Sequence, residues 1–256
     1  MLLLLQYHHI SPNITFNPGT VHKRIFENHV KLLKSYGFSN LNLEKGFDKS
    51  NLKRQVLFTF DDGYKSVFDY AYPILSNYGF TGIVFIVTKY IGQKGDWEVP
   101  LLSSLPQLSQ HEIKTLYKSG WIIGSHSHTH NDLTTLSTTR LKEEIRASIG
   151  TLEDILGDKV YTFSYPFGKY NQRVKETLME YGIKFAFKSS GKLKSPLDPL
   201  EIPRRSIYLI DLDLSYKIDT FYSFFEYPKE LISNKLAYLS PIVLKLLKSF
   251  KGNPSD

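Results

Sequence analysis

The sequence contains no cysteine among its 256 residues. Disulfides, thiolate metal ligands and cysteine nucleophiles are therefore excluded, and a transition-metal site must be built from His, Asp and Glu. Long apolar runs are also absent, since no run approaches the roughly 18 residues of a membrane-spanning helix. The first residues offer only four leucines, without the basic start and cleavage site of a signal peptide. From these absences we expect a cytoplasmic protein, with association to the inner membrane face as a further option.

Basic residues exceed acidic ones by 32 to 25, which gives a formal net charge of +7. The basic residues are scattered and form no run typical of a nucleic-acid-binding arm, so nucleic acid is not predicted as a partner. The length is sufficient for one large core and short for two. A hydrophobic content of 41% and a charged content of 22% are typical of a globular protein.

A repeated unit predicts the fold class. Four helix-like stretches stop at a glycine that an apolar residue follows: Gly37-Phe38, Gly79-Phe80, Gly120-Trp121 and Gly182-Ile183. Glycine just past a helix end caps the last carbonyls, so each unit predicts a helix followed by a strand. We expect strands at 2–7, 56–60, 83–87, 121–123, 161–165 and 184–187, a weaker one at 41–43, and a clear helix at 139–156. Alternation of this kind favours an α/β barrel with a parallel sheet.

Two polar clusters follow predicted strands. Asp61 and Asp62 come directly after Phe60, while His126 and His130 follow the strand at 121–123. Their spacing of four would place both imidazoles on one face of a helical turn, with His128 on the opposite side. Each cluster alone has a plain interpretation, namely a helix-capping turn or an exposed polar turn. Together they supply two imidazoles and a carboxylate for a divalent metal, and leave one carboxylate as a base.

The motifs Thr-Phe-Asp-Asp-Gly at 59–63, His-Ser-x-x-His at 126–130 and Tyr-Pro-Phe-Gly at 165–168 occur in this order. In this respect the sequence resembles the NodB-homology polysaccharide deacetylases, carbohydrate esterase family 4. The resemblance extends from the N-terminal strand to about Ile207. The motif Tyr-His-x-Ile at 7–10 is similar to the subgroup that includes the poly-N-acetylglucosamine deacetylases.

The resemblance implies a distorted (β/α)7 TIM-like barrel that removes N-acetyl groups from aminosugars. Carried over position by position, Asp62, His126 and His130 would bind a divalent metal, zinc being the first choice. Asp61 would be the general base. The backbone N–H of Tyr165 would help to hold the oxyanion of the tetrahedral intermediate.

The sequence departs from the family pattern at two points. Ser164 stands where common members have the arginine that orients the base, and no histidine follows His130 to supply the usual general acid. We expect His8 to be the acid, with His9 left open and a buried strand-end histidine as the plain alternative. We likewise expect Arg204, or its neighbour Arg205, to orient the base, unless both lie on the surface.

The C-terminal region is expected to differ from the barrel. We assign residues 1–220 to the barrel and 221–256 to a helical tail, where a basic amphipathic helix could contact an anionic membrane or pack on the barrel. The predicted function is metal-dependent N-deacetylation of a glycan or glycan precursor, with carbohydrate as partner. Two alternatives remain: a deformylase or cyclic-amide hydrolase with the same site, and a non-catalytic glycan-binding protein on a degenerate barrel.

Overall fold

The computed structural model describes residues 1–13, 19–45, 54–94, 105–192 and 196–208, with residues 211 and 214. All strand pairs of its principal sheet are parallel, and these strands run from the barrel floor to the rim that carries the motifs. The strands are β1 (Leu2–Tyr7), β4 (Ser39–Asn40), β5 (Gln55–Phe60), β6 (Gly82–Ile86), β7 (Ile122–Ser125), β8 (Thr162–Ser164), β9 (Phe185–Lys188), β10 (Ile202–Pro203) and β11 (Arg205–Ser206). A small separate sheet pairs β2 (His9–Ser11) with β3 (Thr20–His22).

The principal sheet closes on itself. Its strand order is β10-β9-β8-β7-β6-β5-β1-β11, with β4 attached to β5 outside this path. Only Arg204 separates β10 from β11, so one chain segment pairs with β9 through its first half and with β1 through its second. The eight strands on the path therefore occupy seven positions around the barrel. The predicted α/β barrel is confirmed.

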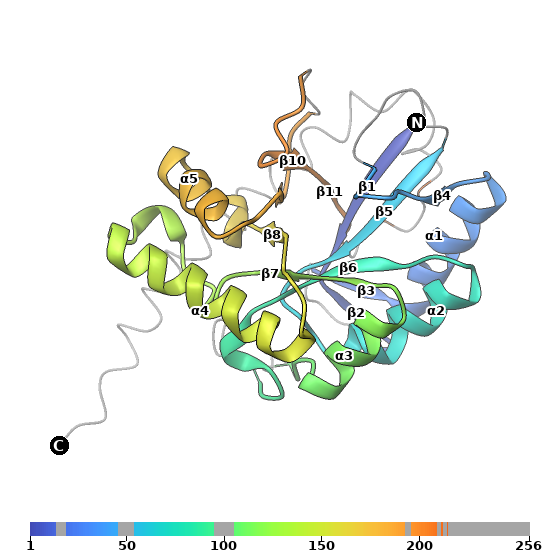
Figure 1. Cartoon of the computed structure of the whole chain (residues 1–256). Coiled ribbons are helices and arrows are strands. Elements are labelled where there is room, and N and C mark those ends of the chain that lie inside the picture. The colour runs from blue at the N-terminus through green and yellow to red at the C-terminus, as the bar shows by residue number, and fades with distance from the viewer. Residues whose placement is uncertain are drawn as a thin grey trace, which may run out of the picture.

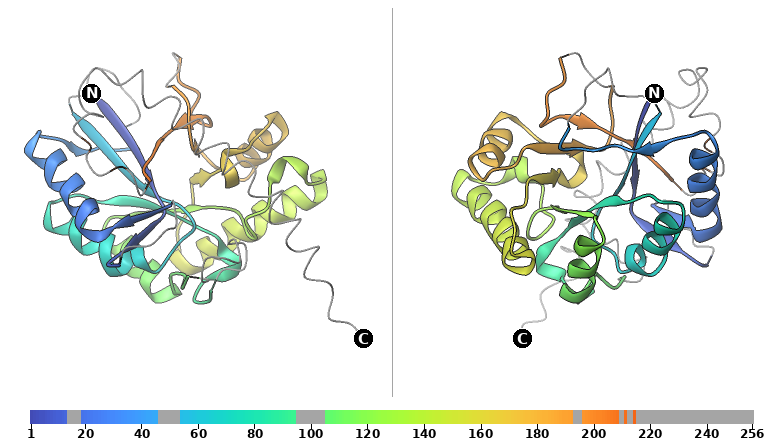
Figure 2. Two further views of the ribbon diagram at one scale, coloured as in Figure 1. Left: turned by 180° about the vertical axis from the view of Figure 1, so that it is seen from behind. Right: turned by 45° about the vertical axis from the view of Figure 1, so that its right-hand side comes forward.

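Helices surround the sheet on its outer side (Figures 1 and 2). They are α1 (Lys23–Ser35), α2 (Tyr72–Asn77), α3 (Gln110–Lys118), α4 (Thr138–Leu156) and α5 (Gln172–Glu180), joined by a π-helical turn η2 (Val67–Ala71) and short 3-10 turns η3 (Thr88–Tyr90), η4 (Leu133–Thr135) and η5 (Pro166–Gly168). The predicted helix at 139–156 is confirmed as α4, whose Leu141, Ile145 and Leu152 are fully buried. Ser137 caps its first turn, and Gly157 ends it in the left-handed conformation.

Strand alternation divides each strand between two environments. On β1, Leu3, Leu5 and Tyr7 belong to the large core under the helices, whereas Leu4 belongs to a second cluster inside the barrel. That inner cluster consists of Leu4, Leu41, Leu43, Leu57, Ile83, Phe85, Phe187 and Ile202. Gln6 is the next inward position of β1, and it begins a polar layer above the apolar floor. The barrel thus presents its polar groups at the carboxyl ends of the strands, where barrel active sites are built.

Some expectations differ from the structure or lie outside it. The weak strand expected at 41–43 is replaced by the two-residue β4, which ends at Asn40. The helical tail expected at 221–256, and the domain boundary at 220, lie outside the described residues and stay predictions. Within the described ranges, no helix is long and apolar enough to cross a bilayer.

Candidate active site

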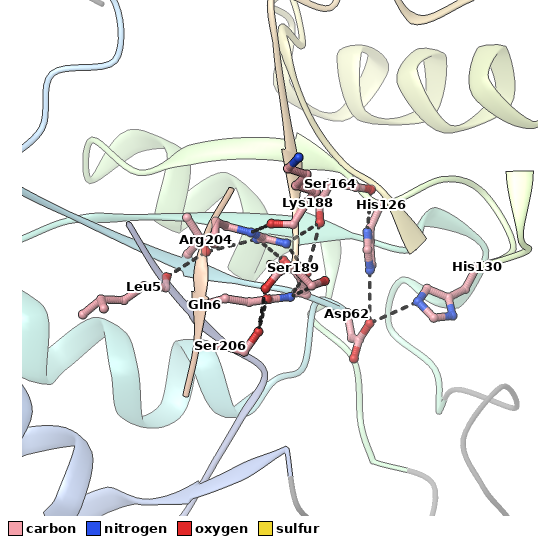
Figure 3. A network of polar contacts seen from close by, with 12 residues as sticks. Leu5, Gln6, Asp62, His126, His130, Ser164, Lys188, Ser189, Arg204 and Ser206 are labelled. Atoms are coloured by element: carbon pink, nitrogen blue, oxygen red, sulfur yellow. Dashed lines mark hydrogen bonds and ion pairs between the residues drawn. The ribbon is translucent and has the colours of Figure 1, made fainter. Parts of the chain in front are cut away.

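The first cluster of the site lies where β5 ends. Asp61 and Asp62 are both buried, with exposed fractions of 2% and 8%. Asp62 has a φ of 70°, a left-handed conformation that aspartate tolerates better than most residues. The two side chains consequently meet different partners. Asp61 contacts an arginine inside the barrel. Asp62 contacts two histidines (Figure 3).

The second cluster follows β7 and faces Asp62. Nε2 of His126 lies 3.4 Å from Oδ1 of Asp62, and Nε2 of His130 lies 3.5 Å from the same oxygen. The expected helical turn is wrong, because Ser127 and His130 have φ values of 65° and 59°. Instead, the N–H of His130 donates to Oγ of Ser127 at 3.0 Å, which closes a loop that brings both rings to one carboxylate. His128 turns away and contacts Oγ1 of Thr88 at 2.9 Å.

This cluster fits a divalent metal. Asp62, His126 and His130 each offer one ligand atom, and these atoms lie within 4.8 Å of one another. Nδ1 of His126 lies 2.8 Å from the carbonyl oxygen of Ser164, which can only accept a hydrogen bond. In the neutral ring Nδ1 therefore carries the proton, and Nε2 has its lone pair toward Asp62, the arrangement typical of a metal-ligating histidine. Two imidazoles and one carboxylate are a common zinc donor set.

Protonation of the metal-free histidines differs between the two rings. Burial lowers the pKa of His126, but the hydrogen bond and charge of Asp62, with the charge of Asp61, outweigh it and raise the pKa overall. Burial and the nearby charge of His126 lower the pKa of His130 to about 3. One ring thus competes for a proton near neutral pH, and the other is neutral there.

Asp61 forms a buried ion pair with Arg204. Nη1 of Arg204 donates to Oδ1 and Nη2 to Oδ2, each at 2.7 Å, and the guanidinium is 1% exposed. Burial alone would raise the pKa of Asp61, but the charge and hydrogen bonds of Arg204 hold it well below its usual range. The expected contact between Arg204 and Asp61 is present. Arg205 instead belongs to β11 and pairs in register with Leu5.

The two N-terminal histidines occupy different surroundings. His8 directly follows β1 and is partly buried, and its charge acts on both carboxylates. Burial raises the pKa values of Asp61 and Asp62, and the cationic groups around them lower both values. His8 is one of these groups, after the larger effects of Arg204 on Asp61 and of His126 on Asp62. His9 instead contacts Oγ1 of Thr20 at 3.3 Å and the edge of the Tyr64 ring. Burial lowers the pKa of His9 to about 4. The contacts of His9 with Thr20 and Tyr64 occupy it away from the carboxylates, so His8 stays the predicted proton donor.

Tyr165 does not take the place expected from the resemblance. Its backbone N–H donates to the carbonyl oxygen of Phe187 at 3.0 Å, because β8 and β9 continue their pairing at this point. Its hydroxyl donates to the carbonyl oxygen of Leu200, and the ring is fully buried under the helices. The residue of this motif that does meet the metal cluster is Phe167, whose ring centroid lies 4.6 Å from that of His130.

Two residues that the sequence did not single out also contact Asp61. Nε2 of Gln6 donates to Oδ2 at 2.8 Å, and Oγ of Ser164 donates to the same oxygen at 3.0 Å. Ser164 was noted only as the position of a missing arginine. Period-two alternation along β1 gives a signal for Gln6, since Leu4 and Gln6 share one side of the strand.

Comparison with known proteins identifies the family. The family model described as polysaccharide deacetylase matches residues 48–186. YxkH of Bacillus subtilis, a candidate polysaccharide deacetylase, is 30% identical over 186 residues, which are 71% of this chain and 62% of that protein. A poly-beta-1,6-N-acetyl-D-glucosamine N-deacetylase of Staphylococcus aureus is 27% identical over 186 residues, 67% of this chain and 61% of the relative.

Solved structures show the same fold. A polysaccharide deacetylase from Bacillus cereus superposes with a TM-score of 0.68 at 25% identity, covering 82% of this chain and 65% of the other. The chain spans about three fifths of the length of the curated relatives it matches. The matched region includes Asp61, Asp62, His126, His130 and Ser164, and ends before Arg204.

Proposed function

Because the chain belongs to the polysaccharide deacetylase family, we propose that it is a metal-dependent hydrolase that removes N-acetyl groups from aminosugars of a glycan or glycan precursor. The observation that carries the proposal is the pairing of two carboxylates with separate partners. Asp62 lies with His126 and His130 in a metal-binding geometry, while the neighbouring Asp61 is ionised and held by Arg204.

Each residue of the site would have a separate role in the reaction. A divalent metal held by Asp62, His126 and His130, most simply zinc, would polarise the acetyl carbonyl and acidify a water. Asp61 would accept the proton of the attacking water, since an ionised carboxylate beside the metal cluster is a general base. His8 would donate a proton to the departing amine, which is a poor leaving group as an anion. Arg204 keeps Asp61 charged and oriented.

The substrate class rests on two supports. The family is named for polysaccharide deacetylation, and one relative is named for poly-beta-1,6-N-acetyl-D-glucosamine. A polymer of N-acetylglucosamine is therefore the first substrate to test. Nucleotide-linked and lipid-linked N-acetylated sugars belong in the same panel, because they present the same acetamido group.

The test is acetate release from that panel by metal-stripped protein with and without added zinc. We expect zinc-dependent acetate from at least one N-acetylated sugar. Formylated sugars and cyclic ureides are included as competing amides of the same chemistry. If these are cleaved while no acetylated sugar yields acetate, the N-deacetylase proposal is wrong and a deformylase or cyclic-amide hydrolase replaces it.

A further inference from the structure

Gln6 is a polar residue buried inside the barrel, with an exposed fraction of 2%. Its amide nitrogen donates to Oδ2 of Asp61 at 2.8 Å and to Oγ of Ser189 at 3.3 Å. Its amide oxygen accepts from Oγ of Ser206 at 2.7 Å. The Gln6 side chain therefore uses both of its N–H donors and one acceptor position of its oxygen (Figure 3).

The orientation of this amide is determined at its Asp61 end and supported at its Ser206 end. Rotating it by half a turn would place its oxygen against the charged Oδ2 of Asp61, where two acceptors would repel each other. At the other end, Ser206 lies directly opposite Gln6 in the parallel pairing of β1 with β11. Ser206 is 2% exposed, and its hydroxyl is held between the amide oxygen of Gln6 and the carbonyl oxygen of Ser189.

The donors around Asp61 are distributed unequally between its two oxygens. Oδ2 receives hydrogen bonds from Gln6, Ser164 and Arg204. Among the described residues, Oδ1 receives one side-chain hydrogen bond, from Nη1 of Arg204. Since a carboxylate oxygen has about two lone-pair positions, Oδ2 is saturated and Oδ1 keeps a position for one more proton.

We propose that Gln6, oriented by Ser206, is a positioning residue that fixes the Asp61 carboxylate and leaves Oδ1 as its proton-accepting oxygen. This inference rests on the proposed function, because it assumes that Asp61 acts as a base. Arg204 alone binds both oxygens symmetrically and cannot distinguish them. The unequal number of donors on the two oxygens arises from Gln6 and Ser164. Of these two residues, Gln6 is the one whose orientation depends on β11, through Ser206.

The contact is tested first without activity, by the 13Cγ chemical shift of Asp61 in zinc-free protein at neutral pH, with the resonance assigned through Asp61→Asn. Gln6→Met keeps the side-chain length and removes the donor, and Ser206→Ala removes the hydroxyl that orients the amide. We expect both variants to move the Asp61 resonance. Thr177→Val is the matched control, since it removes a buried hydroxyl that bonds within α5 at Arg173. An Asp61 resonance unmoved by Gln6→Met overturns the proposal.

The catalytic consequence is tested by steady-state kinetics of zinc-loaded protein on the substrate found above. Loss of one hydrogen bond to a charged carboxylate corresponds to about a tenfold lower kcat, with KM and zinc affinity unchanged. Ser206→Ala should lower kcat in wild-type protein and have no further effect in Gln6→Met, because it acts through the amide. Thr177→Val should keep kcat.

The outcomes separate the two claims. Acetate release by wild-type protein with unchanged kcat in Gln6→Met overturns the positioning role and leaves the proposed function standing. Additive effects of Ser206→Ala and Gln6→Met overturn the orienting role of Ser206. If wild-type protein releases no acetate, the proposed function fails and the catalytic role of Gln6 fails with it, whereas the resonance still decides whether Gln6 holds Asp61.

Discussion

At the scale of single residues, the site depends on two adjacent aspartates with different proposed roles. Asp61 is enclosed by donors inside the barrel, and the left-handed conformation of Asp62 turns it to the two histidines. Their environments, not their chemical type, separate the proposed base from the proposed metal ligand. Substituting each in turn should therefore produce different losses.

We expect Asp61→Asn to lower kcat by at least about 100-fold, as loss of a general base does, while zinc still binds one-to-one. Asp62→Asn should instead lower zinc affinity, because the amide is a weaker ligand than the carboxylate. Acetate release and zinc calorimetry on both variants measure the two losses. Undiminished turnover in Asp61→Asn would exclude Asp61 as the base, and sugar binding without turnover in wild-type protein would favour a glycan-binding role.

The number of protons that zinc binding releases should also depend on pH. The pKa of His126 is raised in metal-free protein, chiefly by Asp62 acting against burial, so zinc must displace a proton from this ring on the acid side of neutrality. His130, with a pKa of about 3, contributes none above pH 5. Zinc affinity should thus rise with pH until His126 is neutral and then level off. Calorimetry in buffers of different ionisation enthalpy counts the protons, and release of two at pH 6 would contradict this assignment.

At the scale of elements, the candidate metal site depends on two loops that leave neighbouring strands. The loop after β7 carries His130, and the loop after β8 carries Phe167, whose ring packs on His130. An ion pair joins the loops, with Nζ of Lys169 2.8 Å from Oδ2 of Asp132. Its two side chains are only 14% and 11% exposed, so solvent screens this pair less than a surface pair.

We expect Lys169→Met to weaken zinc binding by about three- to tenfold, because loosening the loops costs ligand orientation, as loss of supporting contacts around a metal does. Lys142→Met is the control, since it breaks an ion pair with Glu180 whose side chains are 43% and 54% exposed. Zinc titration of both variants measures the difference. Equal affinities in the two variants would show that the loop ion pair does not support the metal ligands.

The elements themselves were largely predictable, and the loops were not. β1 matches the strand expected at 2–7, and α4 begins within one residue of the expected helix, because apolar patterns reflect burial directly. The turn at 126–130 was misread because a spacing of four fits both a helix and a loop, and backbone conformation decides between them. The Tyr165 N–H was misassigned because its partner belongs to β9, a pairing that no local pattern encodes.

The buried network was hidden for a related reason. Gln6 lies in a run of leucines, and its partner Ser206 is 200 residues away in the sequence. A buried amide is stable only where such partners exist, so its role becomes visible after the strands are paired. The sequence does predict Arg204, with Arg205 left open, because the motif at 164–167 lacks the arginine of the family and Arg204 directly follows Pro203.

At the scale of the whole molecule, one residue links the proposed base to closure of the barrel. Arg204 lies between β10 and β11, where the sheet joins its two ends, and its N–H donates to the carbonyl oxygen of Lys188 at 3.1 Å. Its guanidinium stacks over Phe85 and Phe187 while it binds Asp61. The ion pair therefore connects the closing strand to β5 across the barrel interior.

Arg204→Met should destabilise metal-free protein by about 3–5 kcal/mol at neutral pH, because it leaves the buried Asp61 charge without its partner. Adding Asp61→Asn to Arg204→Met removes that charge and should restore much of the loss. Urea unfolding of the two single variants and the double variant measures the coupling. Additive destabilisation would mean that Arg204 acts by packing and strand closure alone.

The same ion pair predicts how the loss of stability in Arg204→Met depends on pH. In wild-type protein the Asp61 pKa is lowered, so its contribution to stability is complete above the ordinary carboxyl pKa and is lost as pH falls through the lowered value. Without Arg204, burial dominates and raises that pKa, so Asp61 costs stability as pH rises through it. The gap between wild type and Arg204→Met should thus be widest at neutral pH and shrink in acid, as unfolding at pH 7 and pH 4 would show. A gap independent of pH would mean that the charge of Asp61 does not contribute to closure of the barrel.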